Sequence, residues 1–360
     1  MPSTLRPVVL LLGCLAAAAA CSDPAPKPDK PAVSKPAAAP AQPKPPVVVA
    51  PAAPSPLAQA VNAASFDPAA ATPEAKQAYL TRAQVLLDRA HVSPGVIDGQ
   101  EGSNLTLALS AFQEAHRLTV DGKLNPATWD ALVADGAPAL TDYVITPEDV
   151  AGPFTPNIPK DDYEAMAQLP ALGYGSPLEA LAEKFHMDEP LLQALNPGVD
   201  FSRAGTTIVV AALGPDGLDG KVTRIEIDNA RGVLKAYADG DKLLAVYPAT
   251  VGSTERPAPV GEWAVNTVAP RPTYTYDPSR LTFGKPKAKL TLRPGPNNPV
   301  GSTWIDLTKD TYGIHGTPDP KLVNKRASHG CVRLTNWDAA ELGAAVQKGA
   351  KVVFEGKPVR

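Results

Sequence analysis

The chain has 360 residues, a formal net charge of −3 at pH 7, 41 prolines and three cysteines. This acidic balance excludes nucleic acid as an expected partner, because nucleic-acid binding relies on clustered basic residues. After the first twenty residues no apolar run approaches the ~20 residues that a membrane span requires, so membrane attachment is expected only through the N-terminus.

Residues 1–20 have the layout of a secretory signal peptide. A basic residue precedes an apolar run, and small residues follow as far as Ala20. The segment Ala18-Ala19-Ala20-Cys21 resembles a bacterial lipobox, so we predict that cleavage leaves Cys21 at the new N-terminus for lipidation. Cys14 follows Leu11-Leu12-Gly13, a better local match to the consensus, but the apolar stretch before it is very short. Ordinary cleavage near Ala20, giving a soluble periplasmic protein, is the alternative.

Residues 21–72 are predicted to form a disordered tether. Proline, alanine and lysine recur in short units such as Lys27-Pro28 and Lys44-Pro45-Pro46. Such a tract favours extended, polyproline-like conformations and cannot bury a core. Ser22 stands where some Gram-negative lipoproteins carry the Asp that retains them in the inner membrane. We therefore expect a periplasm-facing lipoprotein of the outer membrane.

Residues 73–138 are predicted to form a small helical domain. Apolar residues recur at helical spacing in two stretches, about 78–90 and 105–112, and a third helix is expected after Asn125-Pro126. Asp-Gly turns separate the helices. Together with Phe112-Gln113 and the segment ending in Trp129, this pattern resembles the three-helix peptidoglycan-binding domain of cell-wall enzymes. Core packing is the plainer role of the two aromatic rings, so the binding function rests on the resemblance.

Residues 139–212 are predicted to form a linker and a small α+β module. Ser176, Pro177 and Glu179 have the pattern of a capping box at the start of a helix. A second helix is expected to end at Asn196-Pro197-Gly198, before a strand at about 205–210. This order resembles a LysM module, a βααβ fold that binds glycan strands. Its N-terminal strand has a weak pattern, so a rigid spacer is the alternative.

Residues 218–357 change to the period of β-strands. Alternation at 222–228 is followed by apolar stretches at 233–237 and 243–247, and further strands are expected near Trp263 and Ile305. One clear late helix is expected at 338–346. We therefore predict a mostly β domain here and a multidomain protein overall.

Cys331 is the candidate nucleophile of this last domain. The other two cysteines lie in or at the end of the export segment, so Cys331 has no expected disulfide partner. A thiol with a pKa of ~8.5 is mostly protonated at neutral pH and needs a proton acceptor. His329 lies two residues before Cys331 and would share its face on an extended segment. His315 lies further upstream, at a spacing that allows a neighbouring strand to bring it to the thiol.

The segments Ile314-His315-Gly316-Thr317 and Ser328-His329-Gly330-Cys331-Val332-Arg333-Leu334 resemble the L,D-transpeptidase catalytic domain, and the resemblance spans about residues 221–354. It implies that Cys331 is the nucleophile and His315 its general base. It also implies that His329 and Gly330 shape the thiol's surroundings and the oxyanion pocket. The substrate contacts expected from it are Arg333, which would bind a carboxylate, together with Ser328, Gly316 and Tyr312. Neither a metal nor an organic cofactor is expected.

Three assignments have alternatives. His329 could be a structural residue, and Arg333 could pair with a local carboxylate such as Asp338. His315, His329 and Cys331 could hold zinc, because histidine and cysteine are good zinc ligands. No fourth ligand or open-site carboxylate is obvious nearby in the sequence, which disfavours zinc.

The resemblance also implies a reaction. Cys331 would form a thioester with the third residue of a peptidoglycan tetrapeptide stem, release D-Ala, and pass the stem to an amine. The amine would belong to another stem, giving a 3→3 crosslink, or to an outer-membrane protein, giving a tether. The alternatives are a hydrolase that uses water as acceptor and a non-catalytic wall-binding lipoprotein. The predicted partners are therefore peptidoglycan stems and glycan strands, and the membrane through Cys21, in the cell envelope.

Overall fold

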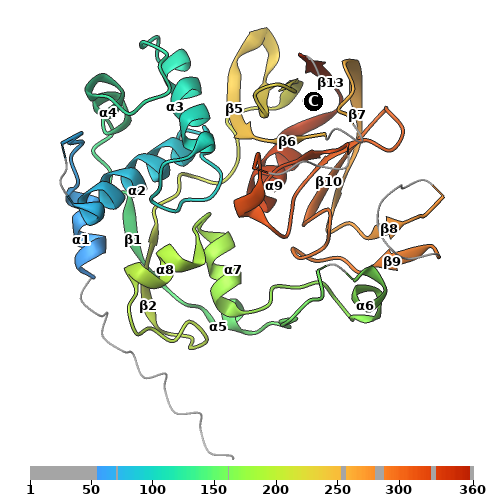
Figure 1. Cartoon of the computed structure of the whole chain (residues 1–360), viewed down its shortest axis with the longest axis horizontal. Coiled ribbons are helices and arrows are strands. Elements are labelled where there is room, and N and C mark those ends of the chain that lie inside the picture. The colour runs from blue at the N-terminus through green and yellow to red at the C-terminus, as the bar shows by residue number, and fades with distance from the viewer. Residues whose placement is uncertain are drawn as a thin grey trace, which may run out of the picture. The chain divides into compact units, whose positions relative to one another are not determined.

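The computed structural model describes residues 55–69, 72–160, 162–252, 257–279, 288–325 and 330–356. In chain order these residues form a group of helices, a small region of helices and two strands, and a large sheet with a helix against it (Figure 1). Within these ranges, no helix is both long enough and apolar enough to cross a bilayer.

Four helices form the N-terminal region: α1 (Pro56–Ala63), α2 (Pro73–Arg89), α3 (Ser103–Ala115) and α4 (Pro126–Leu132). Helices α1, α2 and α4 begin with a proline that follows a capping residue, which is Ser55, Thr72 or Asn125. Proline suits this position because its missing N–H would have no partner within the helix. Helices α2, α3 and α4 are the three that the sequence predicts, and both Phe112 and Trp129 are buried in their common core.

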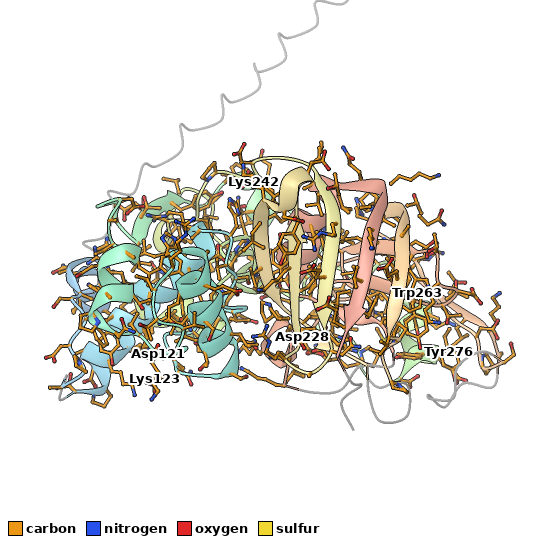
Figure 2. All side chains as sticks on the ribbon, turned by 90° about the horizontal axis from the view of Figure 1, so that it is seen from above. Asp121, Lys123, Asp228, Lys242, Trp263 and Tyr276 are labelled. Carbon is orange, nitrogen blue, oxygen red and sulfur yellow. The ribbon has the colours of Figure 1, made fainter. Side chains whose placement is uncertain are left out.

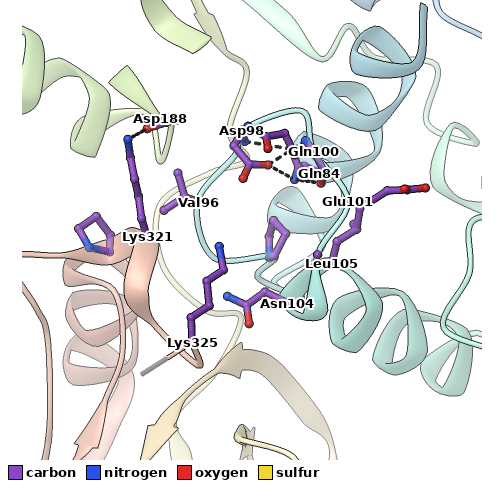
Figure 3. A pocket seen from close by; sticks show the side chains of 13 residues that line it. Gln84, Val96, Asp98, Gln100, Glu101, Asn104, Leu105, Asp188, Lys321 and Lys325 are labelled. Atoms are coloured by element: carbon purple, nitrogen blue, oxygen red, sulfur yellow. Dashed lines mark hydrogen bonds and ion pairs between the residues drawn. The ribbon is translucent and has the colours of Figure 1, made fainter. Parts of the chain in front are cut away.

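Two glutamines hold the Asp-Gly turns of this region. Gln84 of α2 accepts hydrogen bonds from the backbone N–H groups of Asp98 (3.1 Å) and Gly99 (2.7 Å), and its amide donates to the Asp98 carboxylate (2.8 Å; Figure 3). Gln113 of α3 makes the same bonds to the second turn, residues 121–122. Figure 2 labels Asp121 of this turn. Because every polar group of each buried glutamine amide is used, each turn is fixed to the helix that precedes it.

Helix α1 lies within residues 21–72, which were predicted to be a disordered tether, and the prediction is wrong at this helix. Ala58 and Val61 are buried in a core shared with α2 and with residues further along the chain. Two apolar residues one turn apart in a helix of eight give too short a pattern to distinguish from the alanine-rich sequence around it. The rest of the predicted tether up to residue 54 lies outside the described residues.

We call residues 139–212 the central module. Its elements are β1 (Leu140–Val144), α5 (Pro147–Val150), α6 (Tyr163–Gln168), α7 (Pro177–Lys184), α8 (Glu189–Leu195) and β2 (Thr207–Ala211). Strands β1 and β2 pair antiparallel. Ser176 caps α7 by accepting from the Glu179 N–H (3.1 Å), as predicted. The Glu179 carboxylate accepts from the Gly175 N–H (2.6 Å), one residue before the cap, so the reciprocal half of the predicted capping box is replaced by this bond.

The last region contains the large sheet. Its elements are β3 (Val222–Asp228), β4 (Val233–Tyr237), η1 (Asp239–Asp241), β5 (Leu243–Pro248), β6 (Thr250–Val251), β7 (Gly261–Pro270), β8 (Tyr274–Tyr276), β9 (Leu290–Leu292), β10 (Thr303–Leu307), β11 (Gly313–His315), η2 (Pro320–Leu322), β12 (Val332–Arg333), α9 (Asn336–Ala345) and β13 (Val346–Glu355). Nine strands form one sheet in the order β5-β4-β3-β13-β7-β10-β11-β12-β6, and β8 pairs with β9 separately. The mostly β domain predicted from the sequence is confirmed.

Strand β13 lies at the centre of this sheet, although it follows every other strand in the chain. It pairs parallel with β3 and antiparallel with β7. The predicted late helix is present as α9, which packs against β10, β11 and β7 and passes directly into β13. Val352 and Phe354 of β13 are buried in the domain core.

The three regions share cores. Val233 of β4 and Val246 of β5 are buried in the cluster that also contains the apolar residues of α2 and α3. The backbone of Val246 is bonded to this N-terminal region as well, accepting from the Ser93 N–H (2.8 Å) and donating to the His91 carbonyl (2.9 Å). At the other side of the sheet domain, α6 packs against β9 (Figure 1) through a cluster of Met166, Leu172 and Leu292.

Candidate active site

The short parallel pair of β11 and β12 brings the two predicted catalytic segments together. Its register sets Ile314 beside Val332 and His315 beside Arg333. Ile314 and Val332 are fully buried in the sheet core, so His315 and Arg333 share the opposite face, since side chains alternate along a strand. The Leu334 N–H donates to the His315 carbonyl (2.8 Å) and continues the pairing.

His315 is a buried, neutral imidazole. Its Nδ1 lies 2.6 Å from the Gly316 carbonyl oxygen, and because a carbonyl only accepts, Nδ1 must carry the proton. The Trp304 indole of β10 stacks on the ring at a centroid separation of 5.5 Å. Burial, together with the nearby positive charge of Arg333, lowers the pKa of His315 to about 3 although the Gly316 bond opposes the shift. Nε2 is thus available as a proton acceptor at neutral pH.

Cys331 immediately precedes β12 and is partly exposed. Its Sγ lies 3.7 Å from the Thr311 carbonyl oxygen, to which the thiol donates. Gly330 is buried with a φ of 112°, a conformation that favours glycine. Two other predicted site residues, Ser328 and His329, lie outside the described residues.

Arg333 is largely buried on β12, and removal from water lowers the pKa of its guanidinium. Asp319 and the Cys331 thiol both act electrostatically on it. Within the described ranges, the buried Nε of Arg333 has no hydrogen-bond partner. Asp338, the carboxylate that the sequence offered as an alternative partner, instead accepts from the Ser93 hydroxyl (3.1 Å).

A cavity of about 840 Å³ opens beside Arg333. The sheet domain contributes Thr317 and Asp319 to its wall, and the central module contributes Tyr163, Glu179 and Glu189, among others. The size falls within the range of 300–1,000 Å³ that small-molecule sites occupy. This wall was not predicted from the sequence, because the central module was expected to bind glycan or act as a spacer, not to border the catalytic domain.

Tyr312 and Gly316 flank His315 along the chain. The Tyr312 hydroxyl donates to the Pro257 carbonyl (3.4 Å), and the Lys309 ammonium lies 5.0 Å from the centre of its ring. Gly316 is packed so tightly that a Cβ there would overlap Oδ1 of Asn336. Asn336 and Trp304 therefore both support the histidine, and the sequence reasoning identified neither. For Asn336 the signal was its position three residues after Arg333, at the end of the recognised motif.

A second, smaller pocket of about 230 Å³ lies between the N-terminal helices and the loop that leads towards Cys331 (Figure 3). Asn104 of α3 donates to the Val323 carbonyl (3.1 Å) and accepts from the Asn324 amide (3.1 Å). The Asn324 N–H in turn donates to the Thr250 hydroxyl of β6 (2.7 Å). The helical region thus holds this loop shortly before the segment that carries Cys331.

Comparison with known proteins agrees with this architecture. Residues 222–354 match the family model of the L,D-transpeptidase catalytic domain, and residues 76–132 match that of a putative peptidoglycan binding domain. A putative L,D-transpeptidase YkuD of Bacillus licheniformis is 29% identical over 49% of this chain and 93% of that protein. A probable L,D-transpeptidase YcfS of Escherichia coli is 32% identical over 52% of this chain and 61% of that protein. The solved L,D-transpeptidase 1 of Mycobacterium tuberculosis is 24% identical, with a TM-score of 0.27 over 42% of this chain and 66% of that one.

Residues 222–354 are therefore an L,D-transpeptidase catalytic domain. In this chain the L,D-transpeptidase catalytic domain therefore follows a putative peptidoglycan binding domain at residues 76–132. Two of the three domain resemblances expected from the sequence, those to the L,D-transpeptidase catalytic domain and to the peptidoglycan-binding domain, are confirmed.

Proposed function

We propose that Cys331 is the nucleophile of this transpeptidase and that His315 is its general base. The observation that carries the proposal is the parallel pairing of β11 with β12, whose register sets His315 beside Arg333, two residues after Cys331. A nucleophile and a base on adjacent strands satisfy the requirement that thiol activation needs a nearby proton acceptor.

The state of His315 suggests how the proton moves. Nδ1 is occupied by its bond to the Gly316 carbonyl, so Nε2 is the nitrogen that can accept. Burial disfavours the imidazolium and lowers the pKa to about 3, so a stable cation would need a negative charge close by. We infer that the Cys331 proton transfers to Nε2 as Sγ attacks, when negative charge develops beside the ring.

The reaction then has two halves. In the first, Sγ bonds to the carbonyl carbon of the third, diamino-acid residue of a tetrapeptide stem, the C–N bond to D-Ala breaks, and the leaving nitrogen takes the proton from His315. In the second, an acceptor amine attacks the thioester and gives a proton to His315. The C–S bond breaks, and the thiolate recovers its proton. Backbone N–H groups near the buried Gly330 are suited to stabilise the tetrahedral oxyanions.

Arg333 is proposed to bind a carboxylate of the stem. Support comes from its buried Nε, which no described residue satisfies, and from the adjoining cavity. A planar guanidinium suits carboxylate recognition because it can donate two parallel hydrogen bonds. Tyr312, Gly316 and Ser328 complete the proposed substrate contacts, as expected from the sequence, and His329 is proposed to shape the surroundings of the thiol.

The test is intact-mass spectrometry of the purified protein mixed with a disaccharide-tetrapeptide, beside Cys331→Ala, with muropeptide products analysed in the same run. We expect a thioester adduct and a 3→3 dimer with the wild type alone. An adduct that yields only tripeptide in abundant acceptor would make the enzyme a hydrolase. Full crosslinking by Cys331→Ala would reject the nucleophile assignment.

We also propose that the central module is a LysM-like glycan-binding module. Support comes from its order of β1, α7, α8 and β2, with β1 and β2 paired antiparallel. Binding of the whole protein to chitin oligosaccharides, which share the β-1,4-linked N-acetylglucosamine of wall glycans, tests it. Absence of saturable binding would overturn the proposal.

Finally, we propose that the mature protein is an outer-membrane lipoprotein anchored through Cys21, with peptidoglycan stems or an outer-membrane protein as acceptors. The export pattern of the first twenty residues and the small residues before Cys21 support it. Labelling of cells with an alkyne fatty acid should mark the wild type and Cys14→Ser but not Cys21→Ser. If Cys14→Ser lost the label and Cys21→Ser kept it, the assignment of the lipidated residue to Cys21 would be wrong. If the protein fractionated with inner-membrane markers, the outer-membrane location would be wrong.

A further inference from the structure

Asn336, the first residue of α9, lies buried between the central module and the loops around the catalytic histidine. Its Nδ2 donates to both carboxylate oxygens of Glu183 (3.1 and 3.0 Å) and to the Pro296 carbonyl (3.1 Å). Its Oδ1 accepts from the Ser302 N–H (3.0 Å). Because donors and acceptor all have partners, the amide has one preferred orientation.

The oxygen of this amide packs against the residue that follows His315. A Cβ on Gly316 would overlap Oδ1 of Asn336, and so would a Cβ on Gly301 of the neighbouring loop. The Gly316 carbonyl is the acceptor of the His315 Nδ1–H (2.6 Å). The amide therefore lies directly against the peptide that fixes the tautomer and orientation of the imidazole.

Glu183 belongs to α7 of the central module, outside the catalytic domain. It is 8% exposed, and besides Asn336 it accepts from the Tyr174 hydroxyl (3.3 Å). Removal of a carboxylate from water is costly unless hydrogen bonds replace the lost solvation. Here the Asn336 amide supplies two of those bonds, so Glu183 and Asn336 constrain each other across the boundary between the two regions.

We propose that Glu183 is a positioning residue of the transpeptidase: through the Asn336 amide, the central module holds Gly316 and thereby sets the orientation of the His315 ring. The proposal rests on the proposed role of His315 as general base. It gives the central module a part in catalysis that is independent of any glycan binding, because α7 acts on the site through direct hydrogen bonds.

The test compares Glu183→Leu, which has no acceptor for the Asn336 amide, with Glu183→Gln, which keeps one acceptor oxygen. In the full chain labelled with ¹⁵N-histidine, NMR reports the tautomer of His315, and rapid-quench mass spectrometry reports the rate of Cys331 acylation. In the wild type we expect a single Nδ1–H tautomer. Glu183→Leu should give mixed tautomers and acylation slower by about tenfold or more, since small displacements of catalytic groups cost this much, and Glu183→Gln should restore both.

Ser93→Ala is the matched control. It removes a hydrogen bond to α9 from the peptidoglycan-binding side, at Asp338, and touches neither Gly316 nor its loop. It should lower stability without altering the His315 spectrum. If Glu183→Leu fails to fold, Asn336→Ala removes the same contact from the other side, with the same expected spectrum and rate.

The outcomes separate this proposal from the proposed function. If His315→Gln acylates as fast as the wild type, the general-base assignment fails, whatever Glu183 does. If His315→Gln is inactive but Glu183→Leu or Asn336→Ala leaves the His315 tautomer and the acylation rate unchanged, the positioning role alone is overturned. A slower rate that Glu183→Gln does not restore would also overturn it, because the lost acceptor would not be the cause.

Discussion

At the scale of single residues, His315 combines a proposed role in proton transfer with burial that keeps the ring uncharged. Most histidines near neutral pH are close to their own pKa and change charge easily. Here burial and Arg333 lower the pKa to about 3, against a usual value of 6.5. The ring of His315 is therefore uncharged near neutral pH, as the proposed role of proton acceptor requires.

This state leads to a prediction about pH. Because the folded pKa of His315 lies near 3, its ring should not gain a proton between pH 8 and 5. The ¹⁵N signals of this ring, assigned by comparison with His315→Gln, should stay constant over that range. Titration of the ring with a midpoint near 6.5 would contradict the prediction and would indicate that the ring is exposed in solution.

Gly316 leads to a second prediction at this scale. Gly316→Ala should lower both activity and stability, the latter by about 1–3 kcal/mol, because its Cβ would overlap Oδ1 of Asn336 and the packed loops must shift. Urea unfolding and acylation rates measure the two effects. Gly102→Ala is the control, since its Cβ would meet no other atom within 4 Å and its φ of −177° suits any residue. If Gly316→Ala and Gly102→Ala had the same stability and the same acylation rate, the predicted overlap would be refuted.

The residues that are proposed to react could be named from the sequence, but the residues packed around them could not. Cys331 stood out by cysteine count, and His315 and Arg333 belonged to a recognised motif, so all three could be named. Trp304 and Glu183 had no such signal. Strand register places Trp304 against His315, and the packing of the central module places Glu183 against Asn336. Neither arrangement can be derived from local spacing in the sequence.

At the scale of elements, helix α9 is where titratable groups of all three regions meet. Asp338 is fully buried near its N-terminus, bonded to Ser93, and faces Asp88, His186 and Glu341. Burial raises the pKa of Asp338 to about 7, with further contributions from the neighbouring carboxylates. The His186 ring stacks on Trp337 of the same helix and bonds to Asp88 (3.0 Å).

The raised pKa of Asp338 determines the direction in which the free energy of unfolding changes with pH. Between the unfolded pKa of 3.8 and the folded pKa of about 7, the folded state holds a proton that the unfolded state has released. The free energy of unfolding should therefore fall as pH rises through this range. Asp338→Asn cannot ionise, so its stability should fall less between pH 4 and 8, as urea unfolding can measure. Asp130→Asn, at an exposed position, is the control and should lose as much stability as the wild type. If Asp338→Asn also lost as much stability as the wild type, the prediction would be refuted.

The elements themselves were largely predictable, and the exceptions have physical causes. Helices α2, α3, α4, α7 and α8 have clear apolar periodicity, and a side chain caps the N-terminus of α2, α4 and α7. Strand β13 was missed because it follows α9 without an intervening turn, and because Gln347, Lys348 and Gly349 interrupt the alternation of apolar residues in its first half. The predicted capping box at Ser176 was only half formed, since Glu179 bonds to Gly175 and also to the Asn297 amide (2.7 Å).

At the scale of the whole molecule, the shared cores predict that the described regions unfold together. Val246 of β5 is 2% exposed and packs in the core of the peptidoglycan-binding helices. Val246→Ala should lower the free energy of unfolding by about 2 kcal/mol and should shift the helical and the sheet signals by the same amount. Calorimetry and circular dichroism measure this, with the exposed Val260→Ala as control. Two separate transitions would show that the regions are energetically independent.

The position of β13 has a consequence for how such a chain reaches its folded state. Synthesis from the N-terminus delivers β3, β4, β5 and β7 long before the strand that joins β3 to β7. Until residues 346–355 arrive, two half-sheets expose open edges, and open strand edges invite pairing with other chains. The parallel contact between β3 and β13 also spans more than a hundred residues, which slows folding. The joined sheet can therefore form only when almost the whole chain is available.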